Sequence, residues 1–438
     1  MARRQIAHGM GSAMPATSRL NAGSLLWRVF LPFVLAYFLS YLLRNVNAVV
    51  APQLAHDFRL DAAQLGSLTA VYFLGFAAVQ IPLGACLDRF GPVRVQVPLC
   101  LMAALGAAIF SYAQSPWQLV AGRLIIGIGV AAGLVAGLKT IALWFPKDRV
   151  PMMNGTFVAF GTLGAVAATA PTEWLLTVVD WRGLFQIFAC ALVLIALSLS
   201  LLVPAMPRTA MPEDNHGAQL TYGTLFKDQR FWRLAPLSGL SIGSAWALQG
   251  LWAAAWMSDV GGFDRATLVT QLFIMSLVLS MSALGLGGAI SYLKHWGVGP
   301  SKVLPGMVMV LMAAELMLTA GHVLPSIIPW CLVAIMSAGT VATYSITADV
   351  FEKPMLGRVN GAINLFHIGG AFLIQTVIGL IITRWQPLDA GHYPASAYNA
   401  ALLLLASAQA IALSWYWATL PILERIAIDE KPTAEFGP

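Results

Sequence analysis

Long apolar stretches, separated by short polar segments, follow one another along almost the whole chain. The hydrocarbon core of a bilayer is roughly 30 Å thick and every backbone polar group in it must be bonded within its own segment, so an apolar stretch of about 20 residues predicts a membrane-spanning helix. Twelve such helices are expected. They cover residues 27–50, 64–87, 94–113, 117–145, 150–175, 182–203, 232–257, 267–292, 302–321, 325–350, 357–383 and 395–420.

The longest polar connection, residues 204–231, divides the chain after the sixth stretch. It predicts an N-terminal six-helix bundle over residues 27–203 and a C-terminal six-helix bundle over residues 232–420. Polar tails are expected at residues 1–26 and 421–438.

Matching positions 206 residues apart indicate that the two halves are copies of one unit. This offset places Gly91 on Gly297 and, in a separate region, Gly155 on Gly361. One offset that links separate regions predicts an all-α membrane protein of two pseudo-symmetric six-helix bundles.

Composition and charge support this class. Hydrophobic residues make up 58% of the chain and charged residues 10%, against roughly 25% charged in a soluble domain, which argues against a water-soluble enzyme. The net charge is +6, but the basic residues are dispersed, so no nucleic-acid surface is indicated. The four cysteines form no CxxC pair, and no GxxxxGK[ST] loop is present, so we expect no metal site, no cofactor and no ATP-driven transport.

The basic residues also predict the orientation in the membrane. Of the 25 Lys and Arg residues, three lie within the spans and only four, Arg59, Arg182, Arg265 and Arg384, lie on the side opposite the N-terminus. The other eighteen lie on the N-terminal side. By the positive-inside rule both termini are expected in the cytoplasm, in an inner membrane of bacterial type.

Residues 84–94 read GACLDRFGPVR, with a glycine, an acid–base pair, a second glycine and a further base. This segment resembles the cytoplasmic-loop signature of the major facilitator superfamily, and the resemblance implies a secondary transporter with that twelve-helix fold. Its residues Gly84, Asp88, Arg89, Gly91 and Arg94 are expected to form a gate latch. The second half has a lysine, Lys294, where the first has the acid, so the latch is expected to be asymmetric.

Two further groups of residues extend the resemblance. Arg123, in the stretch GRLIIGIG, resembles the arginine-and-glycine pattern of the family's fourth span; a tie to backbone carbonyls and a part in proton coupling are both open. Asp349, Glu352 and Arg358 bracket the turn into the eleventh span and are expected to join the gating charges. The antiporter signature expected near residues 160–165 lacks its glycine–proline pair, which counts against drug export.

Arg44 lies deep within the first span, where a charge is costly unless it faces water, a partner or the bundle interior. The surrounding stretch YLLRNVNA resembles the organophosphate and organic-anion branches of the superfamily, in which a first-helix arginine binds the anionic substrate. Residues 239–257 of the seventh span contain no second basic residue, so a monocarboxylate fits better than a phosphate ester. A structural ion pair with an acid of the bundle is the alternative.

Other polar and aromatic residues are candidate solute contacts. Asn45 and Asn47 flank Arg44, and Gln249 lies near its counterpart in the second half. Each could also serve packing or satisfy backbone groups. The remaining candidates are Lys139, Trp246, Trp252, Tyr344, Asn364, His367 and Gln375.

We therefore expect proton-coupled uptake of a small organic anion, with a carboxylate favoured, by alternating access in a monomeric carrier. Glu315, His367 and Arg123 are the candidates for proton coupling. The alternatives are an importer of a transition metal or metal complex, suggested by methionines in the ninth span, an exporter of amphiphilic compounds, and a receptor without transport.

Overall fold

The computed structural model describes residues 22–146, 149–204, 222–320, 325–352, 355–388 and 392–419, which form helices joined by turns, without a strand among them. Residues 1–21 and 420–438 of the expected tails, and residues 205–221 of the central connection, lie outside this part of the chain.

The first half runs from α1 to α10. Its elements are α1 (Ala22–Leu25), the π-helical turn η2 (Leu26–Phe30), α2 (Leu31–Asn45), α3 (Asn47–Phe58), α4 (Ala62–Phe90), α5 (Pro92–Ser111), α6 (Pro116–Val130), α7 (Gly133–Trp144), α8 (Val150–Ala167), α9 (Ala170–Leu175) and α10 (Trp181–Leu202).

The second half runs from α11 to α19. Its elements are α11 (Tyr222–Leu225), α12 (Gln229–Ala247), the π-helical turn η4 (Leu248–Trp252), α13 (Ala253–Asp259), α14 (Arg265–Lys294), α15 (Pro300–Thr319), α16 (Ile327–Ser337), α17 (Thr340–Val350), α18 (Leu356–Ile382) and α19 (Ala395–Ala418).

The twelve expected spans are all present as helix, which confirms the predicted fold class. Ten helical stretches of the described chain are long and apolar enough to cross a membrane on their own. The other two are interrupted. The span at 150–175 breaks between α8 and α9 at Ala168 and Thr169, and the span at 232–257 contains the π-helical turn η4. Short breaks also occur within the spans at 27–50, 117–145 and 325–350.

Helix ends follow local sequence signals. Asp61 begins α4 as a capping box, accepting from the backbone N–H of Gln64 while the Gln64 side chain accepts from the Asp61 N–H. Gly91 and Gly297, which the 206-residue offset pairs, have φ of 82° and 73°, a region that favours glycine. The internal repeat therefore extends to the backbone of these two turns.

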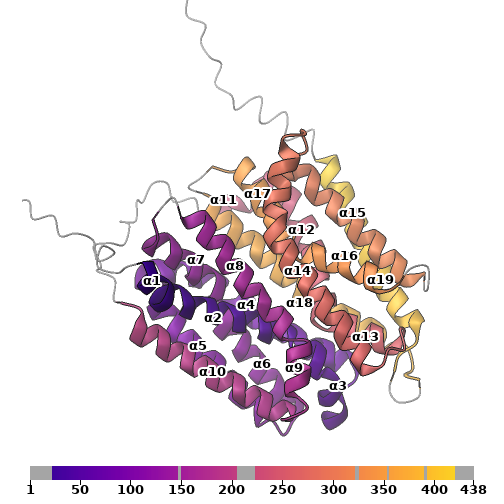
Figure 1. Cartoon of the computed structure of the whole chain (residues 1–438). Coiled ribbons are helices and arrows are strands. Elements are labelled where there is room, and N and C mark those ends of the chain that lie inside the picture. Colours follow the sequence, from indigo (N-terminus) through magenta and orange to yellow (C-terminus); the bar gives the residue numbers. More distant parts are fainter. Residues whose placement is uncertain are drawn as a thin grey trace, which may run out of the picture.

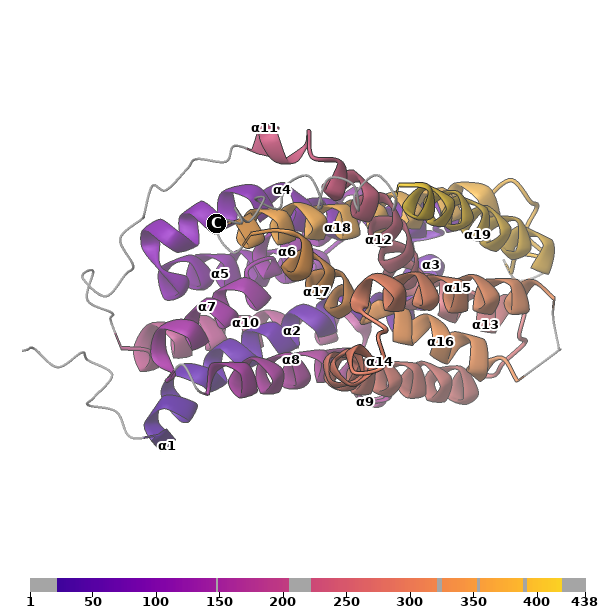
Figure 2. The same cartoon turned by 90° about the horizontal axis from the view of Figure 1, so that it is seen from above.

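The two halves form separate bundles that lie side by side. Figure 1 shows the indigo-to-magenta helices of the first half on one side and the orange and yellow helices of the second half on the other, and the view from above agrees (Figure 2). The buried apolar residues likewise fall into two clusters, one drawn mainly from each half.

The bundles contact each other closely at only one end. We call the end where α1 begins and α19 ends the terminal end, and the opposite one the distal end. At the distal end, a Cβ atom added to Gly66 of α4 would lie 2.8 Å from the carbonyl oxygen of Gln375, and one added to Gly379 of α18 would lie 2.8 Å from that of Ala62. Here α4 and α18 pack backbone against backbone.

At the terminal end the glycines of the facing helices are exposed. An added Cβ on Gly84 of α4 or Gly361 of α18 would have no heavy atom within 4 Å, and the same holds for Gly155 of α8 and Gly285 of α14. The arrangement is closed at the distal end and open at the terminal end.

Candidate functional site

Arg44 lies near the end of α2, where the two bundles face each other. Its guanidinium carbon is 4.8 Å from the ring centroid of Tyr41 in the same helix and 4.8 Å from that of Trp246 in α12. The Phe76 ring of α4 lies at 5.6 Å. Cation–π contacts of this kind stabilise a guanidinium without neutralising it.

No carboxylate in the described part of the chain lies within 4 Å of the Arg44 nitrogens. The ion pairs in that part of the chain involve other residues. Its Nε is buried and has no hydrogen-bond partner. The side chain is therefore held in place by rings and keeps its charge available for an anion.

Aromatic rings continue from Arg44 into the second bundle. The His367 ring of α18 is fully buried and lies 6.1 Å from the Trp246 ring and 6.3 Å from the Tyr344 ring of α17. Neither nitrogen of His367 has a partner. We refer to Tyr41, Arg44, Phe76, Trp246, Tyr344 and His367 as the Arg44 cluster; three of its members come from each bundle.

Tyr41 and Phe76 of this cluster were not among the residues predicted from sequence. An apolar or aromatic residue facing a site has the same sequence signal as one facing the core, so the pattern alone gave no means of finding them.

The amide candidates near the cluster are bonded within the protein. Asn45 donates to the carbonyl oxygen of Tyr41 at 2.8 Å, and Asn47 donates to the hydroxyl of Thr69 at 2.8 Å. Gln249 accepts from the Ser337 hydroxyl at 3.0 Å, and its Nε2 has no partner.

Gln375 and Trp252 lie at the distal end, where the two bundles contact each other. The amide orientation that satisfies both neighbours has Gln375 donating to the Ala247 carbonyl at 3.0 Å and accepting from the Trp252 indole at 3.1 Å. Trp252 also faces Gly66 across the bundle interface. Asn364 is half-buried on α18, three residues before His367 and on the same helix face.

Arg123 is fully buried, and its Nη1 donates to the carbonyl oxygen of Leu43 at 2.9 Å. Leu43 directly precedes Arg44 in the chain. Its guanidinium also lies 5.3 Å from the Tyr72 ring. These contacts tie α6 to α2.

Glu315 is fully buried in α15, away from the Arg44 cluster. One carboxyl oxygen accepts from Gln409 of α19 at 2.9 Å, and the same Gln409 nitrogen donates to Ser244 of α12 at 3.1 Å. The second Glu315 oxygen and the Gln409 oxygen are both buried without a donor. Both oxygens are hydrogen-bond acceptors, so these side chains need one further hydrogen to satisfy them.

The terminal end carries one ion pair within each bundle. Asp88 of α4 binds Lys139 of α7 at 2.5 Å, so Lys139 lies with the latch and not with the Arg44 cluster. In the second bundle Lys294 of α14 binds Asp349 of α17 at 3.0 Å. Since Lys294 lies 206 residues after Asp88, the repeat keeps the pair and exchanges the charges.

The other latch candidates lie around these pairs. Arg89 packs its guanidinium 5.2 Å from the Phe90 ring, while Arg94 and Glu352 are exposed. Arg358 lies in the first turns of α18 and is exposed.

The distal end is held by an ion pair between the bundles. Arg265, at the start of α14, donates to the two carboxylate oxygens of Glu173 in α9 at 2.9 and 2.6 Å. It also donates to the carbonyl oxygen of Val49 in α3 at 2.7 Å. This pairing was not predicted from sequence, where the only signal was one acid at the end of the fifth span and one base just before the eighth.

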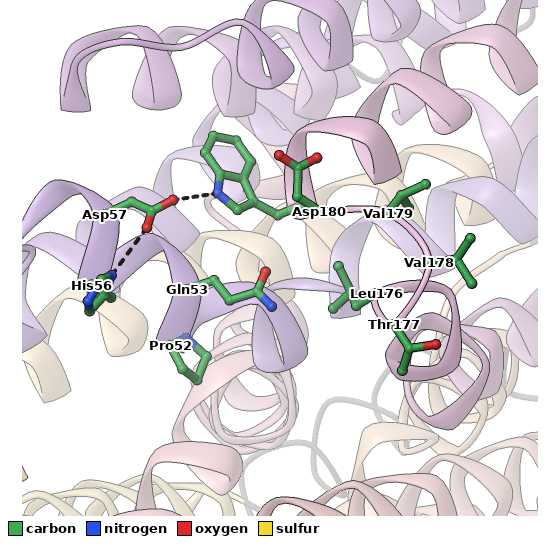
Figure 3. A pocket seen from close by; sticks show the side chains of 10 residues that line it. Pro52, Gln53, His56, Asp57, Leu176, Thr177, Val178, Val179 and Asp180 are labelled. Carbon is green, nitrogen blue, oxygen red and sulfur yellow. Dashed lines mark hydrogen bonds and ion pairs between the residues drawn. The ribbon is translucent and has the colours of Figure 1, made fainter.

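A cavity of about 660 Å³, lined by polar and apolar residues alike, opens at the distal end of the first bundle, between the end of α3 and the loop before α10. Figure 3 shows Asp57 in its wall, bonded to the Trp181 indole at 2.8 Å and to His56 at 3.3 Å. The N–H donated by Trp181 holds the pKa of the Asp57 carboxyl below its usual range. This bond fastens the first span to the sixth.

The described residues contain no group of three or more His, Cys, Asp or Glu side chains placed to hold a metal ion. Met309, one of the methionines that suggested a metal cargo, is exposed on α15.

Comparison with known proteins agrees with this architecture. Residues 33–340 match the sequence profile of the Major Facilitator Superfamily. The chain belongs to this superfamily. It is accordingly a membrane transporter and not an enzyme.

The transporter is similar over most of its length to two proteins named for sugar-acid transport. It is 22% identical to the hexuronate transporter of Escherichia coli strain K12, over 81% of this chain and 86% of that protein. It is also 22% identical to the galacturonate transporter of Dickeya chrysanthemi, over 70% of this chain and 92% of that protein.

Its fold resembles that of a bacterial homologue of the human lysosomal transporter Spinster, solved in an inward-facing, unoccupied conformation. The TM-score is 0.75 at 19% identity, covering 91% of this chain and 97% of that one.

Proposed function

We propose that the protein takes up a small organic carboxylate across the inner membrane of a bacterial cell, by alternating access and together with a proton. Arg44 binds the carboxylate. The relatives named above are transporters of acidic solutes, which supports an anion as the cargo.

The observation that carries this proposal is the state of Arg44. A guanidinium removed from water is costly unless it is paired, and here it lies between the bundles with rings around it and no carboxylate of the described chain within 4 Å. A carboxylate ligand supplies the missing counter-charge through two parallel hydrogen bonds.

The uneven distribution of basic residues, eighteen on one side of the predicted spans and four on the other, supports placing the terminal end and both chain termini in the cytoplasm. With that orientation, the open terminal end and the sealed distal end correspond to an inward-open state. The proposed carrier works as a monomer, because each bundle contributes to the Arg44 cluster within one chain.

Proton coupling is supported by Glu315. A fully buried carboxyl without a counter-charge is expected to hold a proton, and this proton would provide a donor where the Glu315 and Gln409 oxygens lack one. His367, buried beside Trp246 with two unpartnered nitrogens, is a second proton carrier to test.

Solute binding is tested by thermal unfolding of the purified, detergent-solubilised protein against a panel of small carboxylates and their uncharged amides. We expect stabilisation by at least one carboxylate and not by its amide, because only the carboxylate neutralises Arg44. The stabilisation should disappear in Arg44→Ala and persist in the control Arg384→Ala, which removes an exposed arginine at the distal end.

Transport is then measured as uptake of the stabilising carboxylate into proteoliposomes, with and without an inward proton gradient. Accumulation that follows the gradient supports symport. Stabilisation that survives Arg44→Ala would remove Arg44 from the site, and uptake indifferent to the gradient would refute the proton coupling.

A further inference from the structure

The Arg44 cluster offers ring faces where a sugar-acid site needs hydrogen-bonding groups. Tyr41, Trp246 and Tyr344 are each partly exposed, and the Tyr41 and Trp246 centroids lie equally far, 4.8 Å, from the Arg44 guanidinium. A ligand whose carboxylate reaches Arg44 must therefore pass its body along aromatic surface.

Most amides near the site are already used inside the protein, whereas Asn364 is half-buried on α18 and has no hydrogen bond from its side chain to the described part of the chain. Asn45 and Asn47 donate within the first bundle, Gln375 is bonded on both sides, and the Gln249 oxygen is occupied by Ser337. Turning any of them toward a ligand would break a bond inside the protein. The buried polar atoms near the site that lack a partner are the Arg44 Nε, the Asn47 Oδ1, the Arg123 Nε and Nη2, the Gln249 Nε2 and the two His367 nitrogens.

These observations weigh against a polyhydroxylated body. Each hydroxyl of a sugar acid leaves its hydrogen bonds to water on binding and must regain them from the site, and a buried polar group that fails to do so is penalised. A flat unsaturated ring instead stacks against Tyr or Trp and gains from the contact.

We propose that the solute is a carboxylate on an aromatic ring, with no more than one or two polar substituents, and not a sugar acid. This inference rests on the proposed function, since it takes Arg44 as the carboxylate ligand. The solute body lies against Trp246 and Tyr344, and a single polar substituent is placed to meet His367.

The test uses three carboxylates of similar size in the thermal-unfolding assay: benzoate, cyclohexanecarboxylate and D-glucuronate, with benzamide as the uncharged control. Benzoate should stabilise the full-length protein most, cyclohexanecarboxylate should bind about tenfold more weakly, and glucuronate should have no effect at the same concentration. Trp246→Phe keeps a ring and should retain the preference for benzoate over cyclohexanecarboxylate. Trp246→Leu keeps only apolar bulk and should lose it.

The outcomes separate the two levels of the argument. Stabilisation by glucuronate but not by benzoate, lost in Arg44→Ala, would overturn the aromatic body and leave the carboxylate site intact. Equal binding of benzoate and cyclohexanecarboxylate would show that the site selects only for apolar bulk, and would also overturn the aromatic body. No response to these three acids, with stabilisation by another carboxylate of the wider panel, would overturn the aromatic body alone. Binding of benzoate and benzamide alike, or no response to any carboxylate of the panel, would overturn the proposed function together with this inference.

Discussion

The ion pair between Arg265 and Glu173 should decide how long the distal end stays closed. It joins α14 of one bundle to α9 of the other, and the Arg265 guanidinium also reaches the Val49 carbonyl of α3. The substitution Glu173→Gln removes the charge and keeps the shape of the side chain. We expect it to shift the protein toward the state that is open at the distal end.

The size of the shift follows from the geometry. The Arg265 side chain is 37% exposed and that of Glu173 is 29% exposed, so water screens their attraction. Exposed ion pairs contribute roughly 0.2–1 kcal/mol, and the two short hydrogen bonds place this one near the upper limit. A loss of about 1 kcal/mol corresponds to a change of about fivefold in the ratio of closed to open forms.

Spin labels on the two bundles can report that ratio. Val178 and Leu388 are exposed at the distal end of the first and second bundle respectively, and the distance between labels there should lengthen in a larger fraction of molecules of Glu173→Gln. The four native cysteines are replaced first. Arg182→Gln is the matched control, because its partner Asp57 lies in the same bundle and at the same end.

An unchanged distance distribution in both Glu173→Gln and Arg265→Gln would refute the role of this pair. An equal shift in Arg182→Gln would show that any loss of charge at the distal end opens it. Exchange of the two charges, in Glu173→Arg with Arg265→Glu, should restore part of the closed population.

Three further predictions concern other parts of the molecule. Glu315→Gln should leave the thermal unfolding temperature nearly unchanged, since the proposed neutral carboxyl is replaced by a neutral amide. It should abolish proton-driven accumulation of the solute, while exchange of solute between equal pools continues. Unaltered accumulation would contradict the proton site. Gly91→Ala should lower the unfolding temperature, because a side chain at φ 82° costs about 1 kcal/mol, whereas Gly84→Ala, where an added Cβ meets no atom within 4 Å, should not; equal effects would contradict the strain argument. The bond to Trp181 lowers the pKa of Asp57, so its contribution to stability is present above the unfolded pKa of about 3.9 and disappears as the pH falls through the folded value. Asp57→Asn should therefore destabilise the protein at pH 7 and match the wild type near pH 2. A loss of stability that persists in acid would contradict this account.

Much of the molecule was predictable from local pattern. A hydrocarbon layer demands about 20 apolar residues for each crossing, so the twelve spans, their division into halves and the pairing of Gly91 with Gly297 follow from sequence spacing. The interruptions within spans, such as those at α8–α9 and at η4, were not predicted, because they do not change the hydropathy of the span.

The candidate site was only partly predictable. Arg44 is marked in the sequence by its charge at a depth where charges are expensive. Its neighbours Tyr41 and Phe76 are not marked, because an aromatic residue facing a site has the same pattern as one facing lipid or the core. Lys139, near the end of the fourth predicted span, was also a candidate solute contact, and the fold places it beside Asp88 at the terminal end.

The sequence by itself determined the number of helices, the duplication and the presence of the deep cations Arg44 and Arg123, because all three are properties of spacing along the chain. The tertiary structure decided which bundle ends meet, that Arg265 reaches Glu173, and that Arg44 has rings around it and, among the residues that the structure describes, no carboxylate within 4 Å. Contacts between the bundles join residues far apart in sequence, such as Arg265 and Val49. No periodicity encodes such a contact, since it depends on how the two packed bundles are set against each other.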